Sequence, residues 1–162
     1  MNGKHQVTRT VEVATEPAAI WDVIADSTLL PQWAGVVKDV TYLSEMDEGV
    51  GMTRHCNVEL GGRTGTMTER CVEFLPNRRA AYVVDDDTLG FHRMLLDYGF
   101  AITLEPRSDG ATELRIDTYY TPRNPLYALL NRLVLRRRMG KLVDGLLQGL
   151  KQISERRSAP AA

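Results

Sequence analysis

The chain has 162 residues, of which 43% are hydrophobic and 25% are charged, and its net charge at pH 7 is −1. These values are typical of a soluble globular protein and exclude long disordered or membrane-spanning classes. We predict one domain over residues 1–157 and a flexible tail over residues 158–162, because this length suffices for a single hydrophobic core. The first residues contain no apolar run that could act as a secretory signal, so we expect a cytoplasmic protein.

The charges are distributed unevenly along the chain. Residues 123–157 contain nine Lys or Arg residues against two acidic ones, Asp144 and Glu155. We interpret this stretch as a solvated helix face, which is the usual meaning of a charge run. The alternative is a peripheral contact with an anionic membrane through residues 136–138. We expect no nucleic-acid partner.

The histidines and cysteines are few, and their spacing fits neither a disulfide framework nor a metal site. We therefore expect both cysteines to be reduced and buried, and we assign no metal and no cofactor. The residues concerned are Cys56, Cys71, His5, His55 and His92.

The first elements are a strand and two short helices. Residues 7–13 alternate between apolar and polar side chains, which predicts a strand with one buried face. A short helix follows, with Thr15 as a plausible cap and Pro17 in its first turn. A second helical segment ends at Trp33, directly before the next strand. Trp33 is either a core residue or the wall of a binding site.

Six further extended stretches follow, and each is bounded by turn residues. Short connections between successive strands imply an antiparallel meander. The predicted strands cover residues 36–44, 50–60, 63–75, 79–84, 92–105 and 112–121.

The C-terminal part predicts one helix of about 30 residues, with Asn124 as its cap and Pro125 at its first position. Its apolar residues recur every three or four positions, and we expect this stripe to be buried against the sheet. The fold class is therefore α+β, with a curved seven-stranded antiparallel sheet around a long C-terminal helix. The stripe consists of Leu126, Leu129, Leu130, Leu133, Val134, Met139, Val143, Leu146, Leu150 and Ile153.

Three glycines, Gly140, Gly145 and Gly149, lie inside this predicted helix. Each costs about 1 kcal/mol relative to alanine, so their presence needs a reason. They either allow close packing against the sheet or leave room for a bound molecule.

The Gly61-Gly62 pair predicts a two-residue hairpin turn, which sets the register of its two strands. In this register Arg54 lies opposite Glu69 on the apolar, concave face, while His55 faces outward. The pair is either a salt bridge at the rim or a polar anchor inside an apolar cavity. As an anchor, Arg54 would hold a carbonyl, carboxylate or phenolate, and Glu69 would orient it.

The next hairpin places Tyr98 and Phe100 on one strand and Tyr120 on the other in the inward phase. Each tyrosine either finds a backbone partner in the core or lines a cavity. The candidate ligand-binding residues are Trp33, Met52, Arg54, Cys56, Met67, Glu69, Tyr98, Phe100, Tyr120 and Leu146. The candidate catalytic residues are Arg54, Glu69, Tyr98 and Tyr120.

Several stretches together resemble the polyketide cyclase/dehydrase branch of the START-like (SRPBCC) superfamily, over nearly the whole chain. They are "EVATEPAAIWDVIADSTLLPQWAGVVKDV", "GVGM", "MTERCVEFLPNRRAAYVV" and "FAITLEPRSDGATELRIDTYYTP". The resemblance implies a helix-grip fold with a deep cavity between sheet and C-terminal helix. It also implies that the short helices help to close this cavity, with Trp33 at or near its mouth. Members bind or carry lipids, sterols and polyketides, and some cyclise polyketides.

Three functions are compatible with these features. The first is binding or transport of a small hydrophobic ligand, which needs only a cavity and an entrance. The second is a polyketide aromatase/cyclase, in which Arg54 stabilises an enolate, Tyr98 or Tyr120 donates a proton, and Glu69 acts as base or orienting group. No histidine is assigned to the cavity and no nucleophile has a nearby base, so we place this second. The third is a protein- or membrane-interaction module through the basic helix. The oligomeric state is left open.

Overall fold

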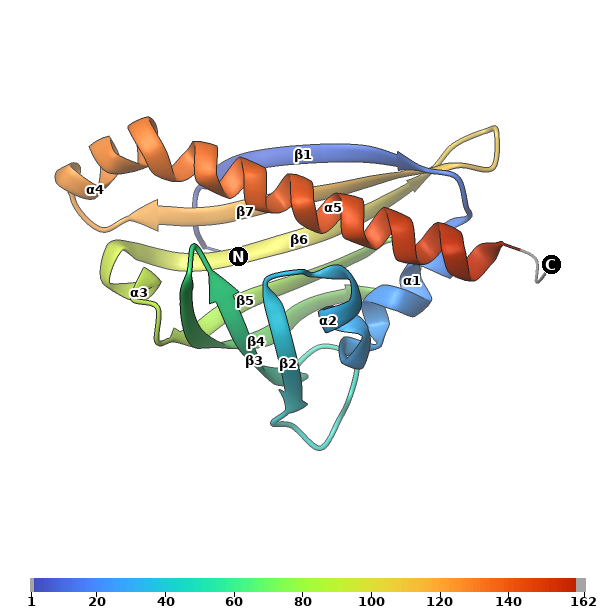
Figure 1. The fold of residues 1–162 in the computed structure, drawn as a ribbon, viewed down its shortest axis with the longest axis horizontal. Helices are drawn as coiled ribbons and strands as arrows, with labels where there is room; N and C mark the ends of the chain where they lie inside the picture. The colour runs from blue at the N-terminus through green and yellow to red at the C-terminus, as the bar shows by residue number, and fades with distance from the viewer. Residues whose placement is uncertain (1, 160–162) are drawn as a thin grey trace.

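The computed structural model describes residues 2–159, which form a seven-stranded antiparallel sheet with helices on one face (Figure 1). The strand order is β1-β7-β6-β5-β4-β3-β2, so β1 and β2 are the edge strands. The strands are β1 His5–Val13, β2 Val37–Tyr42, β3 Thr53–Leu60, β4 Arg63–Leu75, β5 Arg79–Asp87, β6 Leu95–Pro106 and β7 Thr112–Pro122. The predicted α+β fold with its antiparallel meander is confirmed.

The two predicted short helices follow β1, and the long helix follows β7. The helices are α1 Pro17–Ala25, α2 Leu30–Trp33, α3 Phe91–Met94, α4 Pro125–Leu130 and α5 Arg136–Ser158. A short 3₁₀ helix, Ser27–Leu29, precedes α2, and a π-helical turn, Asn131–Leu135, joins α4 to α5. The C-terminal helix therefore begins with Pro125 and the Asn124 cap as predicted, but its regular α-helical geometry is interrupted.

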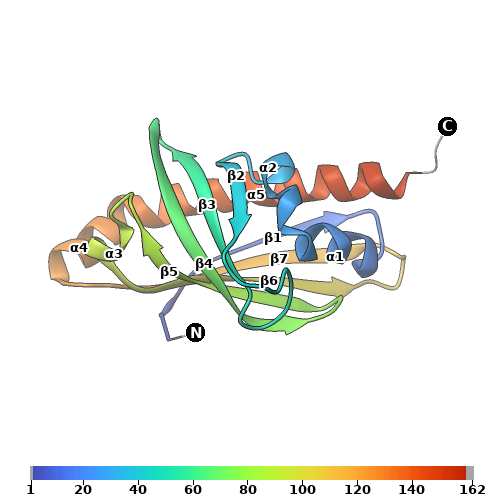
Figure 2. The same cartoon turned by 90° about the horizontal axis from the view of Figure 1, so that it is seen from below.

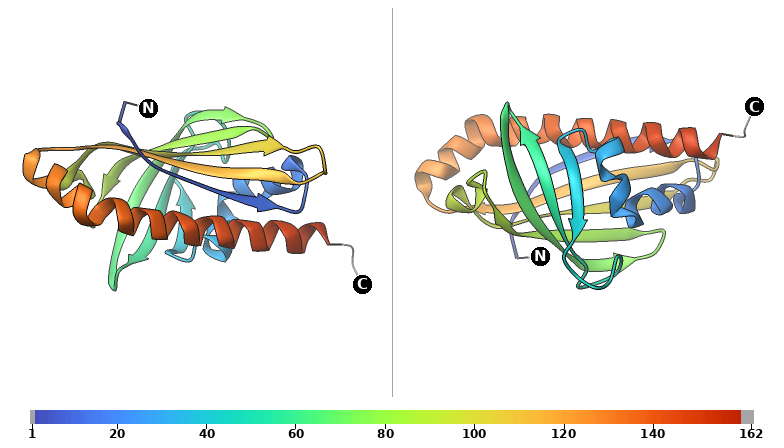
Figure 3. Two further views of the ribbon diagram at one scale, coloured as in Figure 1. Left: turned by 90° about the horizontal axis from the view of Figure 1, so that it is seen from above. Right: turned by 60° about the horizontal axis from the view of Figure 1, so that its bottom comes forward.

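The sheet bends around α5, and β2, β3 and β4 rise beside this helix (Figure 2). α1 and α2 lie near the C-terminal part of α5, while α4 lies at its opposite end (Figure 3). This is the helix-grip arrangement implied by the resemblance. Of the predicted flexible tail, Ser158 is the last residue of α5, and residues 160–162 lie outside the described part.

The predicted register of the β3–β4 hairpin is correct. Gly61 and Gly62 both have positive φ angles, 60° and 77°, which a tight hairpin turn of this kind requires. Arg54 is paired with Glu69 across the two strands. The alternation of side chains therefore places both charged residues on the inner face.

Residues 92–94 were expected to begin a strand, but they belong to α3, and β6 starts at Leu95. The reason is a local cap. The Asp87 carboxylate accepts hydrogen bonds from the backbone N–H groups of Gly90, Phe91 and His92, which holds these residues in a helical turn.

The apolar stripe of the C-terminal helix is only partly buried. Met139, Val143, Leu150 and Ile153 belong to the core, as predicted. Leu126, Leu129 and Leu133 are instead exposed, and the buried residue of their segment is Asn131. No helix in residues 2–159 is both long enough and apolar enough to cross a membrane.

Close packing explains Gly149, but its partner is α2 and not the sheet. A Cβ atom on Gly149 would lie 2.0 Å from the backbone oxygen of Trp33. A Cβ on Gly145 would meet no atom within 4 Å, and one on Gly140 would meet the end of the Arg9 side chain at 2.6 Å. The three glycines therefore have three different surroundings.

Candidate ligand-binding cavity

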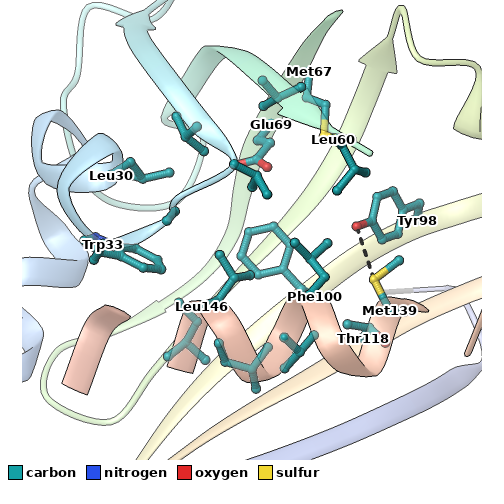
Figure 4. A pocket seen from close by; sticks show the side chains of 18 of the residues that line it. Leu30, Trp33, Leu60, Met67, Glu69, Tyr98, Phe100, Thr118, Met139 and Leu146 are labelled. Atoms are coloured by element: carbon teal, nitrogen blue, oxygen red, sulfur yellow. Dashed lines mark hydrogen bonds between the residues drawn. The ribbon is translucent and has the colours of Figure 1, made fainter. Parts of the chain in front are cut away.

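A cavity of about 90 Å³ lies between the sheet and α5 (Figure 4). Its walls come from α2, the strands β2, β3, β4, β6 and β7, the short helix α3, and α5. Most of the lining is aliphatic or aromatic. Seven of the ten candidate residues line it, namely Trp33, Arg54, Met67, Glu69, Tyr98, Phe100 and Leu146.

Three candidate residues do not line this cavity, although all three are buried. They are Met52, Cys56 and Tyr120. Tyr120 belongs to the junction between sheet and helix, because its hydroxyl donates to Asn131 Oδ1 at 2.7 Å. Burial raises the pKa of both Tyr120 and Cys56 to about 12, so both stay protonated at neutral pH. The alternation of apolar and polar residues along a strand identifies its inner face, but only part of that inner face borders the cavity.

Other lining residues were not singled out from the sequence. Thr118 and Met139 were predicted to lie on the inward faces of β7 and α5. Nothing else in the sequence distinguished them as cavity residues. Phe91 was not singled out, because it lay directly before the strand expected over residues 92–105 and no helix was expected there. Leu30 and Val37 lie on either side of Trp33 and line the cavity with it.

The Arg54–Glu69 pair is buried and lines the cavity, so it is not a solvent-exposed salt bridge at the rim. The two side chains are 3% and 11% exposed. Arg54 donates from Nε to Glu69 Oε2 at 2.9 Å, and its Nη2 lies 2.7 Å from the same oxygen. Burial alone would lower the pKa of Arg54, but the adjacent Glu69 carboxylate more than offsets this, and the pKa is raised.

The Arg54 guanidinium is further fixed by two neighbours. Its Nη1 donates to the Ser27 hydroxyl at 3.0 Å, and its central carbon lies 4.2 Å from the centre of the Tyr82 ring, in cation–π geometry. The other oxygen of the carboxylate, Glu69 Oε1, accepts no hydrogen bond from residues 2–159. The guanidinium therefore holds the carboxylate in one orientation and leaves Oε1 without a partner among the described residues.

Two hydroxyl groups add to the polar character of the cavity. Among residues 2–159, Tyr98 donates only to Met139 Sδ, at 3.9 Å, which is a weak contact (Figure 4). Burial raises the pKa of Tyr98, so its phenol stays neutral and can donate a hydrogen bond. The Thr118 hydroxyl is buried and has no hydrogen-bond partner within the described chain.

Trp33 combines both roles that the sequence left open. It is 7% exposed and belongs to the hydrophobic core, yet its ring also lines the cavity (Figure 4). If Gly149 carried a Cβ atom, the atom nearest to it would be the backbone oxygen of Trp33. The packing of α2 on α5 therefore sets the position of this wall.

The cap of α3 holds Phe91 at the cavity, and this cap depends on the charge of Asp87. Although burial tends to raise the pKa of Asp87, hydrogen bonds from the backbone and ring of His92 and from the Phe91 and Gly90 N–H groups lower it. The charged form therefore stabilises the fold above the pKa of the unfolded chain. That contribution is lost as the pH falls through the lower pKa of the folded state.

We expect Asp87→Asn to lower the free energy of unfolding by about 1–2 kcal/mol at pH 7, because the amide accepts these hydrogen bonds less strongly. The difference from the wild type should shrink at acidic pH, where Asp87 is protonated in both states. Urea unfolding at neutral and acidic pH measures both effects. The exposed neighbour Asp86→Asn is the control and should show neither. Equal stability of Asp87→Asn and the wild type at pH 7 would contradict the role of the cap.

A family model described as polyketide cyclase / dehydrase and lipid transport matches residues 4–155. No curated protein sequence matches the chain. The match includes α1, α2, the whole sheet and most of α5. It therefore covers every element that contributes to the cavity.

Solved structures share the fold at low sequence identity. The ZhuI aromatase/cyclase from Streptomyces sp. R1128 has a TM-score of 0.78 at 21% identity, over 98% of both chains. A START superfamily protein from Mycobacterium smegmatis has a TM-score of 0.77 at 18% identity, over 95% of this chain and 99% of the other. Norcoclaurine synthase from Thalictrum flavum has a TM-score of 0.76 at 12% identity, over 98% and 99%.

At these identities the structures establish the fold, and the family model establishes the relationship. The matched residues, the seven-stranded sheet and the terminal helix agree with the resemblance seen in the sequence. The chain belongs to the polyketide cyclase / dehydrase and lipid transport family.

Proposed function

We propose that this protein binds a compact apolar molecule carrying at least one hydroxyl group in the cavity between sheet and α5. The observation that supports this most directly is the free acceptor Glu69 Oε1 in a largely apolar lining. A ligand hydroxyl can donate to this oxygen, while the Tyr98 phenol donates to the same or a second ligand oxygen. Ligand sites commonly combine apolar walls with a few placed polar groups in this way.

The size of the cavity favours a small ligand in this conformation. Its volume of about 90 Å³ is below the roughly 300–1,000 Å³ of sites for drug-sized molecules. A lipid or a full-length polyketide chain would require α2 or α3 to move outward. α3 is a single turn between two strands, so its displacement would disturb little of the core.

Binding or transport takes precedence over catalysis in this proposal. The raised pKa of Tyr98 keeps its phenol protonated, so it can donate a hydrogen bond, but it makes the phenol a weak general acid at neutral pH. The alternative, an aromatase/cyclase, is favoured by the similarity to the Streptomyces aromatase/cyclase and by the same Glu69 and Tyr98 groups. Native mass spectrometry of protein from its own source would identify a resident molecule. A change in its mass on incubation would separate enzyme from carrier.

We expect 2-naphthol to bind more tightly than naphthalene when each is titrated into the protein and binding is followed by calorimetry. Tyr98→Phe should weaken 2-naphthol binding roughly fivefold to tenfold, since one hydrogen bond is lost, and leave naphthalene binding unchanged. Leu146→Trp should abolish binding of both by filling the cavity. Tyr120→Phe is the matched control, because that hydroxyl lies outside the lining, and it should not alter either affinity.

Two results would count against the proposal. Equal affinity for 2-naphthol and naphthalene would remove the role of the polar groups. Unchanged binding in Leu146→Trp would show that the probes bind elsewhere on the protein.

A further inference from the structure

Three leucines project from the segment that joins β7 to α5. Leu126, Leu129 and Leu133 are 70%, 55% and 62% exposed. Their spacing of three and four residues places them along one side of α4 and the π-helical turn, at one end of the molecule (Figure 1). Single exposed leucines are ordinary, but an ordered row of three marks a contact surface. We call these three residues the leucine ridge.

The buried residue of the same segment is polar, whereas the buried positions of an ordinary surface helix are apolar. Asn131 is buried, accepts a hydrogen bond from the Tyr120 hydroxyl and donates to Gln6 Oε1 at 3.0 Å. Arg136 donates to the backbone oxygen of Gln6 at 2.7 Å. This network ties the segment to β1 and β7 in one orientation. The leucine ridge is therefore held outward by specific hydrogen bonds.

Positive charge surrounds the leucine ridge. Residues 118–143 contain no Asp or Glu, and they include Arg123, Arg132, Arg136, Arg137, Arg138 and Lys141. Within the described chain, Arg132, Arg137, Arg138 and Lys141 form no salt bridge. The surface around the ridge is therefore cationic and not neutralised by neighbours.

A hollow of about 430 Å³ continues the leucine ridge toward α5. It is lined by Leu133 and Val134 together with Arg9, Arg137, Arg138, Lys141 and Asp144. Four cations thus face one carboxylate, which is already paired with Arg9 at 3.1 Å. Gly140 allows this arrangement, because a Cβ there would collide with the Arg9 guanidinium. We call this feature the basic hollow, and Leu133 belongs to both surfaces.

We propose that the leucine ridge and the basic hollow dock this protein on an anionic membrane surface. The leucines enter the headgroup layer, and the hollow receives the phosphate of an anionic lipid. Apolar side chains flanked by Lys and Arg are the combination that holds amphipathic segments in such an interface. A nucleic acid would use the cations but leave the leucine ridge in water. This proposal does not rest on the ligand-binding function.

The position of the docking surface relates it to the cavity. α3 and α4 lie at the same end of the molecule (Figures 1 and 2). Phe91 of α3 and Met139 at the start of α5 both line the cavity. Docking through the leucine ridge therefore brings that end of the cavity toward the membrane.

The test is sedimentation of the purified full-length chain with vesicles of phosphatidylcholine, with or without phosphatidylglycerol, at low and high salt. We expect binding only with phosphatidylglycerol, and weaker binding at high salt. Arg137→Glu/Arg138→Glu should reduce the affinity at least about tenfold, and Leu129→Ser/Leu133→Ser should also reduce it. Inorganic phosphate at millimolar concentration should not displace the vesicles, which separates a membrane site from a free-phosphate site.

The matched control is Arg156→Glu/Arg157→Glu, which makes the same charge change at the other end of α5 and should keep the wild-type affinity. All exchanged residues are exposed, so urea unfolding should be unaffected. An equal loss in both arginine variants would overturn the proposed location. Absent binding, salt-independent binding, or full binding by the serine variant would overturn the proposal itself.

Discussion

Arg54→Leu is expected to lower the free energy of unfolding by about 3–5 kcal/mol, because it leaves the Glu69 carboxylate buried without its counter-charge. Both side chains are almost completely buried, and Ser27 loses its hydrogen-bond partner as well. Little water can reach the remaining carboxylate, so hydration does not replace the lost guanidinium. Urea unfolding at neutral pH measures the loss.

A double variant isolates the cause of this effect. In Arg54→Leu/Glu69→Leu no unpaired charge remains, so most of the lost stability should return, to within about 1–2 kcal/mol of the wild type. The control is Arg70→Leu, because Arg70 pairs with Asp85 on the exposed side of the same sheet at 2.7 Å. That exposed pair should contribute no more than about 1 kcal/mol. If Arg54→Leu were as mild as Arg70→Leu, burial of the Arg54–Glu69 ion pair would not decide its contribution to stability.

Gly149→Ala is expected to destabilise the protein by about 2–3 kcal/mol, because the new methyl group cannot fit 2.0 Å from the Trp33 backbone oxygen. Backbone atoms cannot rotate away as a flexible side chain can, so α2 must move away from α5. Since Trp33 forms part of the cavity wall, affinity for 2-naphthol should change together with stability. Urea unfolding and calorimetry measure the two effects.

Gly145→Ala is the matched control in the same helix. Its Cβ would meet no atom within 4 Å, so the substitution should stabilise the helix by up to about 1 kcal/mol. Opposite signs for the two glycine variants would show that contact with α2 decides the outcome. Similar small gains for both would mean that α2 does not pack closely on Gly149.

The sequence by itself determined the order of the elements and the register of the central hairpin. Both depend on local signals. The Gly61-Gly62 pair is suited to positive φ angles, and the alternation along each strand then decides which side chains face inward. The seven strands, the two short helices after β1 and the start of the C-terminal helix at Pro125 could therefore be predicted without a structure, whereas α3 could not.

Local sequence signals did not decide which of the inward-facing side chains line the cavity. Cys56 and Arg54 share one face of β3, yet only Arg54 lines the cavity. Tyr98 and Tyr120 share the inner face of the sheet, yet Tyr120 is bonded to Asn131. The orientation of Arg54 also depends on Ser27 and Tyr82, which are distant in the sequence.

The C-terminal segment shows the same limit most clearly. Its periodic leucines predicted a buried stripe, and this holds for α5 but not for α4. Asn131 occupies the inward position, because Tyr120 and Gln6 offer it hydrogen-bond partners that only the folded sheet brings together. The sequence determined that an amphipathic helix forms here. Only the tertiary structure decided which of its sides faces the protein, because the competing contacts come from strands at both ends of the chain.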